Sequence, residues 1–177
     1  QECVGLASDS NKLYLGIDFS AVEGNDYTAL SVLNDRCEVV DIWYTNKMTP
    51  SERVDWLCGI INKYDGVQKI LAETNSIGNV YIDLLKKRCK YPITGFTTTN
   101  ASKQDLVNML QLCLDNKEIK LKDDKELLKE LQAYQATVNI NTKKVSYNAS
   151  NGFNDDLVMA LMLSLKALKS SYGKYTI

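Results

Sequence analysis

Acidic residues stand at the ends of apolar stretches, and this pattern constrains the fold more than any other feature of the chain. Asp18 closes one apolar run and Glu73 closes another. Asp155 and Asp156 open a long apolar helix. Carboxylates are poor strand formers, and a buried carboxylate is costly unless it is paired or binds a metal. Three such placements in one small domain indicate a shared divalent cation, and hence phosphate chemistry.

The sequence contains no histidine. Ser-His and Cys-His nucleophilic catalysis, H-E-x-x-H zinc chemistry and a histidine general base are therefore excluded. The five cysteines are widely spaced and form no C-x-x-C pair, which indicates free thiols in a reducing compartment. Any chemistry must use carboxylates, lysines, hydroxyls and metal.

Length and composition suit one domain with a core of ordinary size. Hydrophobic residues make up 45% of the chain and charged residues 24%, as in globular proteins. No apolar run reaches the roughly 18 residues that span a bilayer, so we expect no membrane partner. The chain begins at Gln1 without methionine. We therefore expect a single domain, residues 1–177 with a core of about 13–168, excised from a longer protein.

The hydrophobic pattern predicts three strands followed by alternating helices and strands. Strands are expected at 13–20, 28–33, 37–45, 68–74 and 92–96. Helices are expected at 50–63, 78–89, 102–114, 125–135 and 155–168, with turns at 24–26 and a hairpin at 138–147 around 141–144. This order is typical of a mixed sheet flanked by helices. Right-handed crossovers make the fourth strand parallel to the first, so that Asp18 and Glu73 would meet at the carboxyl edge, where ligands usually bind.

Each acidic segment also has a simpler explanation when it is taken alone. Asn154 is a favoured helix cap, and acids in a first turn complement the helix dipole. Asp18 could be a hydrogen-bonded residue at a strand end, and Glu73 could pair with a lysine. Their joint arrangement in a mixed α/β fold is what favours a metal site.

Four motifs follow one another in a characteristic order. They are Gly16-Ile-Asp18-Phe-Ser20, Asp26-Tyr-Thr-Ala-Leu-Ser-Val32, Glu73-Thr-Asn75-x-x-Gly78 and Asn154-Asp155-Asp156-Leu-Val-Met-Ala160. Together they resemble the nuclease domain of viral terminase large subunits, the DNA-packaging motors of tailed bacteriophages and herpesviruses. That family often has histidine where this chain has Asn154. We interpret Asn154 as a helix cap or an outer-shell residue, so this difference leaves the four acids unaffected. It also carries an N-terminal ATPase, but the chain has no G-x-x-x-x-G-K-[ST] loop.

The resemblance implies an RNase H-like fold, with a mixed five-stranded sheet in the order 3-2-1-4-5, flanking helices and a β-hairpin before the last helix. It also implies a divalent-metal-dependent endonuclease that cuts concatemeric double-stranded DNA. Asp18 matches the metal ligand on the first strand and Glu73 the acid on the fourth. Asp156 matches the metal ligand on the last helix, and Asp155 the acid beside it.

The resemblance and the donor set predict two Mg²⁺ or Mn²⁺ ions, because these hard cations prefer oxygen ligands. In two-metal hydrolysis, we expect Asp18 to bridge the ions and Asp156 to hold the ion that activates water. Glu73 and Asp155 would complete the pair.

Double-stranded DNA is the expected substrate, gripped through its phosphates. The candidate contacts are Lys86, Lys87, Arg88, Lys103, Lys143 and Lys144. Solvated helix faces explain most such runs of charge, and we interpret Lys103 as a helix-surface lysine, with a place near the scissile phosphate as the alternative. Asp26 and Asp83 are interpreted as turn and helix-surface residues.

The resemblance also implies partners and a location. The partners are an N-terminal ATPase domain, a portal protein and a small terminase subunit. The location is the host-cell cytoplasm for a phage, or the nucleus for a herpesvirus.

Three alternatives stay open at the level of sequence. A Holliday-junction resolvase of the RNase H-like class would use the same acids. Gly16-Ile-Asp18-Phe-Ser20 also resembles the first phosphate loop of actin-like ATPases, although no second loop is evident. A non-catalytic docking module is the third alternative, and the intact acid set argues against it.

Overall fold

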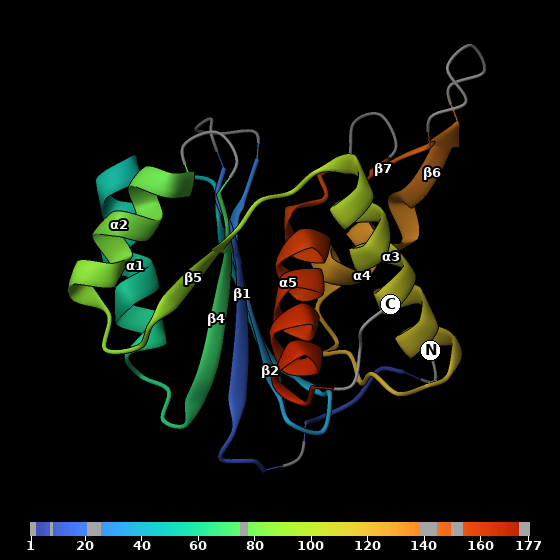
Figure 1. Ribbon diagram of the computed structural model, residues 1–177, viewed down its shortest axis with the longest axis horizontal. Coiled ribbons are helices and arrows are strands. Elements are labelled where there is room, and N and C mark those ends of the chain that lie inside the picture. Colours follow the sequence, from blue (N-terminus) through green and yellow to red (C-terminus); the bar gives the residue numbers. More distant parts are fainter. Residues whose placement is uncertain are drawn as a thin grey trace.

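A five-stranded sheet in the order β3-β2-β1-β4-β5 forms the centre of the molecule (Figure 1). The computed structural model describes residues 3–7, 9–20, 26–74, 78–138, 145–149 and 154–173. The strands are β1 (Leu13–Asp18), β2 (Thr28–Asn34), β3 (Val39–Thr45), β4 (Val67–Glu73) and β5 (Ile93–Phe96). β1 pairs antiparallel with β2 and parallel with β4. The predicted mixed sheet and its order are therefore confirmed.

Helices cover both faces of this sheet (Figure 1). α1 (Pro50–Ile61) and α2 (Gly78–Arg88) lie on one face, and α5 (Asp156–Ser171) lies on the other, with α3 (Asn100–Asp115) and α4 (Lys125–Ala133) packed against it. Successive strand residues point to opposite faces. Leu15 and Ile17 accordingly join the core under α1 and α2, whereas Tyr14 joins the core under α5. Burial on both faces explains why β1 is almost continuously apolar.

The contact between β1 and α5 is unusually close at Gly16. A β-carbon on Gly16 would collide with the carbonyl oxygen of Ala160 and the backbone nitrogen of Ser164. The absence of a side chain thus lets the backbone of α5 lie directly against β1. Because β1 ends at Asp18 and α5 begins at Asp156, this packing also decides how near those two acids come.

The observed element boundaries differ from the predicted ones in a few places. β3 begins at Val39 rather than at residue 37, because Cys37 lies in a turn with a φ of 62° and donates its N–H to the Asn34 carbonyl at 3.2 Å. α4 ends at Ala133, where β6 (Tyr134–Val138) begins directly. β6 and β7 (Val145–Ala149) form the predicted antiparallel hairpin before the last helix. Its predicted turn at 141–144, together with residues 24 and 25, lies outside the described residues.

In the part of the chain that the structure describes, no helix is both long and apolar enough to cross a bilayer.

Candidate functional site

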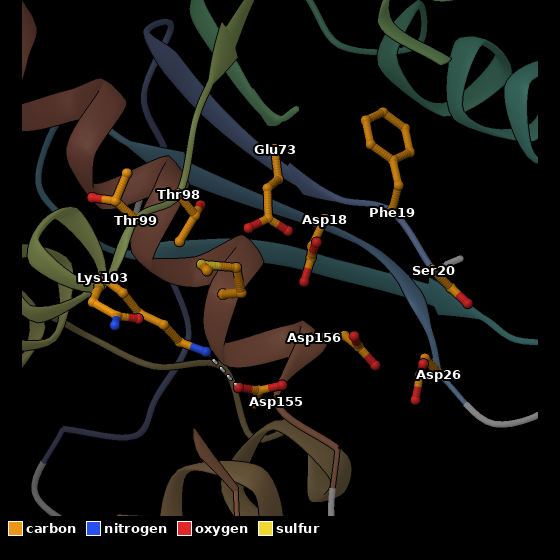
Figure 2. Close-up of a pocket in the computed structure, with 12 residues that line it drawn as sticks. Asp18, Phe19, Ser20, Asp26, Glu73, Thr98, Thr99, Lys103, Asp155 and Asp156 are labelled. Atoms are coloured by element: carbon orange, nitrogen blue, oxygen red, sulfur yellow. Dashed lines mark hydrogen bonds and ion pairs between the residues drawn. The ribbon is translucent and has the colours of Figure 1, made fainter. Parts of the chain in front are cut away.

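A cavity of about 400 Å³ opens at the carboxyl edge of β1 and β4 (Figure 2). It is lined by Asp18, Phe19, Ser20, Asp26, Glu73, Thr98, Thr99, Asn100, Lys103, Asp155, Asp156 and Met159. The four acids that the sequence singles out, Asp18, Glu73, Asp155 and Asp156, all line this cavity. The structure therefore brings them together, although they come from two strands and a helix that are far apart along the chain.

Asp18 is the most buried of these acids, with only 7% of its surface exposed. Burial raises the pKa of the Asp18 carboxyl well above its usual range, and a hydrogen bond with Glu73 raises it further. The negative charges of Glu73, Asp156 and Asp155 act in the same direction. The carboxyl group of Asp18 therefore sits where a proton or a cation is strongly favoured.

Asp156 is the first residue of α5 and lines the same cavity as Asp18, with its side chain between those of Asp18 and Asp26 in Figure 2. Its Oδ2 accepts the backbone N–H of Tyr27 at 2.7 Å. Burial raises the pKa of Asp156 to about 7, against the lowering effect of the Tyr27 hydrogen bond, and the charges of Asp26, Asp155 and Glu73 add to the increase. Asp156 is thus also held in a position that favours a positive partner.

Asp155 occupies the N-cap position of α5, but its side chain does not cap the helix. Instead, its Oδ2 accepts a hydrogen bond from the Lys103 ammonium at 3.0 Å, drawn as a dashed line in Figure 2. The side chain of Lys103 is 20% exposed and lines the cavity. The interpretation of Lys103 as an ordinary helix-surface lysine is therefore wrong. Asn154 does not cap α5, because the N-cap is the next residue, and its alternative role as an outer-shell residue of the site stays a prediction.

Asp26 is a cavity residue that the sequence analysis left as part of a turn. It lines the cavity beside Asp156, and its charge helps to raise the pKa of that acid. The pairing of β1 with β2 is antiparallel, with Asp18 opposite Ala29. The residues just before β2 must therefore lie near the end of β1, and this topological signal could have identified Asp26.

The beginning of α3 forms the opposite wall of the cavity. Thr99 is its N-cap, and the Thr99 side chain accepts the backbone N–H of Ser102 at 3.2 Å. Thr98, Thr99 and Asn100 line the cavity together with Lys103. The positive end of the helix dipole and the Lys103 ammonium thus face the acids.

The donor set fits a hard divalent cation, since the acids offer only carboxylate oxygens and hydroxyl groups stand nearby. In this arrangement, however, no three Asp, Glu or Cys side chains of the described residues stand close enough together to enclose one ion. Lys103 holds Asp155, and the Tyr27 N–H holds Asp156. The role of the four acids as metal ligands therefore stays a prediction.

The predicted DNA contacts on α2 lie away from the cavity. Lys86, Lys87 and Arg88 form the last turn of α2, and β5 starts soon after them and runs parallel to β4. This turn therefore lies at the amino edge of the sheet, opposite Glu73. Arg88 forms an ion pair with Asp55 there. Lys143 and Lys144 lie outside the described residues. A DNA-binding role for any of these residues stays a prediction.

A mixed five-stranded sheet in the order 3-2-1-4-5 with helices on both faces is an RNase H-like fold. Within that class, the chain belongs to the terminase RNase H-like domain family, whose model matches residues 15–168. No curated protein matches the chain.

Solved structures of phage terminases share this fold. The large terminase nuclease of the thermophilic phage G20c is 23% identical, with a TM-score of 0.77 over 93% of this chain and 83% of that one. The nuclease domain of the Thermus phage P74-26 large terminase is 24% identical, with a TM-score of 0.72 over 86% and 77% of the two chains. The HK97 bacteriophage large terminase is 14% identical, with a TM-score of 0.74 over 94% of this chain and 41% of its own.

Proposed function

We propose that this chain is the endonuclease domain of a viral DNA-packaging terminase, which cuts concatemeric double-stranded DNA by metal-dependent phosphodiester hydrolysis. The observation that carries the proposal is the convergence of Asp18, Glu73, Asp155 and Asp156 on one cavity. Membership of the terminase family supports the assignment. The carboxyl edge of the sheet is also where open α/β folds usually bind ligands.

The relatives support a divalent cation, and the choice among such cations follows from the donor atoms. The G20c nuclease has been solved with bound magnesium, with bound cobalt and with bound zinc. In this chain, burial and mutual repulsion raise the pKa of Asp18 and Asp156, and a nearby positive charge would relieve both effects. We therefore assign Mg²⁺ or Mn²⁺ to this cavity and propose that it binds two ions.

Asp18 is central among the proposed ligands, because the charges of Glu73, Asp155 and Asp156 all act on it. Asp18 would help to hold both ions, Asp156 would hold the ion that activates water, and Glu73 and Asp155 would complete the set of ligands. Two such ions would stabilise the attacking and the leaving oxygens of a phosphodiester. The carboxylates would have to move closer together on loading, and Asp155 would exchange its contact with Lys103.

DNA would approach the cavity with its backbone toward the wall formed by α3. The Lys103 ammonium and the N-terminus of α3 present positive charge there, which suits a phosphate. Contacts of this kind carry no base sequence information and weaken steeply with salt. In the complete packaging machine, we assign the N-terminal ATPase, the portal protein and the small subunit as partners, in the cytoplasm of the infected host for a phage.

The first test is cleavage of supercoiled plasmid by the purified chain in Mn²⁺, in Mg²⁺ and in EDTA. We expect nicking and linearisation with metal and none in EDTA. Asp18→Asn should abolish cleavage. Asp83→Asn is the matched control, because Asp83 is an exposed residue of α2, and it should cut like wild type. Equal cleavage by wild type and Asp18→Asn would refute the proposal. Cleavage restricted to four-way junctions would favour a resolvase instead.

A further inference from the structure

Glu130 is a buried carboxylate for which the proposed hydrolysis has no use. It lies on α4 and is only 2% exposed. Its Oε2 accepts the backbone N–H of Leu157 at 2.9 Å and that of Val158 at 3.2 Å. Its Oε1 is buried and has no hydrogen-bond partner among the described residues. Both hydrogen bonds that the structure describes for this carboxylate are thus made with the first turn of α5.

The two N–H groups that Glu130 binds are those that a local cap would bind. The side chain of an N-cap residue normally accepts the N–H of the second or third helical residue. With Asp155 at the N-cap of α5, these are the N–H groups of Leu157 and Val158. Aspartate is among the best capping residues, yet Asp155 does not cap this helix. Glu130 occupies the positions that Asp155 would otherwise take.

The consequence for Asp155 is visible in the cavity. Its carboxylate points to Lys103 at 3.0 Å instead of back onto its own helix. Asp156, the next residue, accepts the Tyr27 N–H and also lines the cavity. The N–H groups of Leu157 and Val158 at the start of α5 therefore have a hydrogen-bond acceptor, while Asp155 and Asp156 both line the cavity.

We propose that Glu130 is a positioning residue, which caps α5 from α4 and thereby keeps Asp155 available to the cavity. This role rests on the proposed function, since it is the metal-binding acids that Glu130 positions. Placing a further carboxylate behind Asp155 and Asp156 adds to the repulsion among the acids. A cap supplied by the N-cap residue itself would avoid that repulsion but would turn Asp155 away from the cavity.

Competition between Glu130 and Asp155 for the same N–H groups can be measured without metal. In Glu130→Ala, Asp155 becomes free to cap α5, so the variant should fold and lose little stability. Asp155→Ala should then be more harmful in the Glu130→Ala background than in wild type. We expect the additional loss of Tm, measured in EDTA, to be about 2–4 °C, the value of one cap in a chain of this size. Strictly additive losses of Tm would overturn the competition.

The effect of Glu130 on metal binding in the cavity is measured by calorimetric titration of the variants with Mn²⁺. Glu130→Ala should bind Mn²⁺ roughly 10–100-fold more weakly, as is usual when a group that orients a ligand is lost. Glu130→Gln keeps an oxygen in place for the two N–H groups and should restore affinity close to that of wild type. Glu126→Ala is the matched control, because Glu126 is on the same helix and pairs only with Lys129 among the contacts described. It should bind like wild type.

The outcomes separate this role from the proposed function. Unchanged Mn²⁺ affinity in Glu130→Ala, beside a wild type that binds, would overturn the positioning role while the nuclease assignment stands. A loss in Glu130→Gln as large as in Glu130→Ala would also overturn it, because the cap would still be present. If wild type binds no Mn²⁺, the nuclease assignment fails, and the additivity of the Tm losses alone decides whether Glu130 displaces Asp155.

Discussion

The Lys103 ammonium lies 3.0 Å from the Asp155 carboxylate and joins the start of α3 to the start of α5. Both side chains are partly buried, at 20% and 31% exposure. In the metal-free protein, the lysine thus supplies positive charge at the place where we assign a divalent cation. We therefore expect this ion pair to contribute more to the free energy of unfolding without bound metal than with it.

Lys103→Met should destabilise the metal-free protein by up to about 1 kcal/mol, the range for a partly exposed ion pair. Saturating Mn²⁺ should remove most of this loss, because the cation then compensates Asp155. The measurement is the Tm with Mn²⁺ and with EDTA. Lys90→Met serves as the control, since Lys90 pairs with Asp65 far from the cavity. Its effect should not depend on metal, and a metal-independent effect at Lys103 would contradict our interpretation.

Asp18→Asn should stabilise the metal-free protein while abolishing Mn²⁺ binding. The substitution removes a carboxyl group whose ionised form is disfavoured by burial and by Glu73, Asp155 and Asp156, and relief of this kind is worth about 0.5–2 kcal/mol. Urea denaturation in EDTA gives the free energy of unfolding. In saturating Mn²⁺ the order should reverse, because only wild type gains stability from binding. A variant that is less stable than wild type in EDTA would show that repulsion does not dominate at Asp18.

The stability of the metal-free protein should fall as the pH rises from about 4 to about 7. The pKa of Asp156 and that of Glu130 are each raised to about 7 in the folded chain, and that of Asp18 is raised as well. The folded state therefore binds more protons than the unfolded state in this range, and its advantage is lost as these groups ionise. Each unit of pKa shift is worth about 1.4 kcal/mol.

The pH dependence is measured as Tm in EDTA, for wild type and for Asp156→Asn. The variant should show a shallower fall, because one of the titrating groups is gone. Saturating Mn²⁺ should flatten or reverse the fall, since the metal competes with protons for the carboxylates. Equal slopes for the two proteins in EDTA would rule out Asp156 as a contributor.

Gly16→Ala should lower the free energy of unfolding by about 1–3 kcal/mol, the usual cost of overpacking. The new β-carbon would push α5 away from β1 at Ala160 and Ser164. Since Asp18 and Asp156 lie at the ends of these two elements, Mn²⁺ affinity should fall as well, measured at a temperature where the variant is folded.

Gly59→Ala is the matched glycine substitution. Among the described residues, no heavy atom lies within 4 Å of the position of a β-carbon on Gly59. The residue is inside α1, so alanine should stabilise the chain by about 0.4–1 kcal/mol and leave Mn²⁺ binding unchanged. A loss of stability similar to that of Gly16→Ala would mean that the close approach of α5 is not the cause.

The sequence by itself determined the order of the elements and the four acids that meet in the cavity, whereas the order of the strands in the sheet was expected from the family resemblance. The first two features are local in origin. Apolar periodicity records which residues are buried, and an acid at the end of an apolar run records where a strand or helix ends. Once β1 and β4 are neighbouring parallel strands, Asp18 and Glu73 must share an edge.

The tertiary structure alone decided which other side chains surround those acids. From the local sequence, Asp26 was interpreted as a turn residue and Lys103 as a helix-surface lysine. The basic residues at 86–88 were interpreted as candidate DNA contacts. Their positions depend on how β2 pairs with β1, where α3 begins and in which direction α2 runs. Glu130 likewise meets α5 only through helix packing, 27 residues away in sequence. Contacts between distant segments leave no local periodicity, so only the packed structure reveals them.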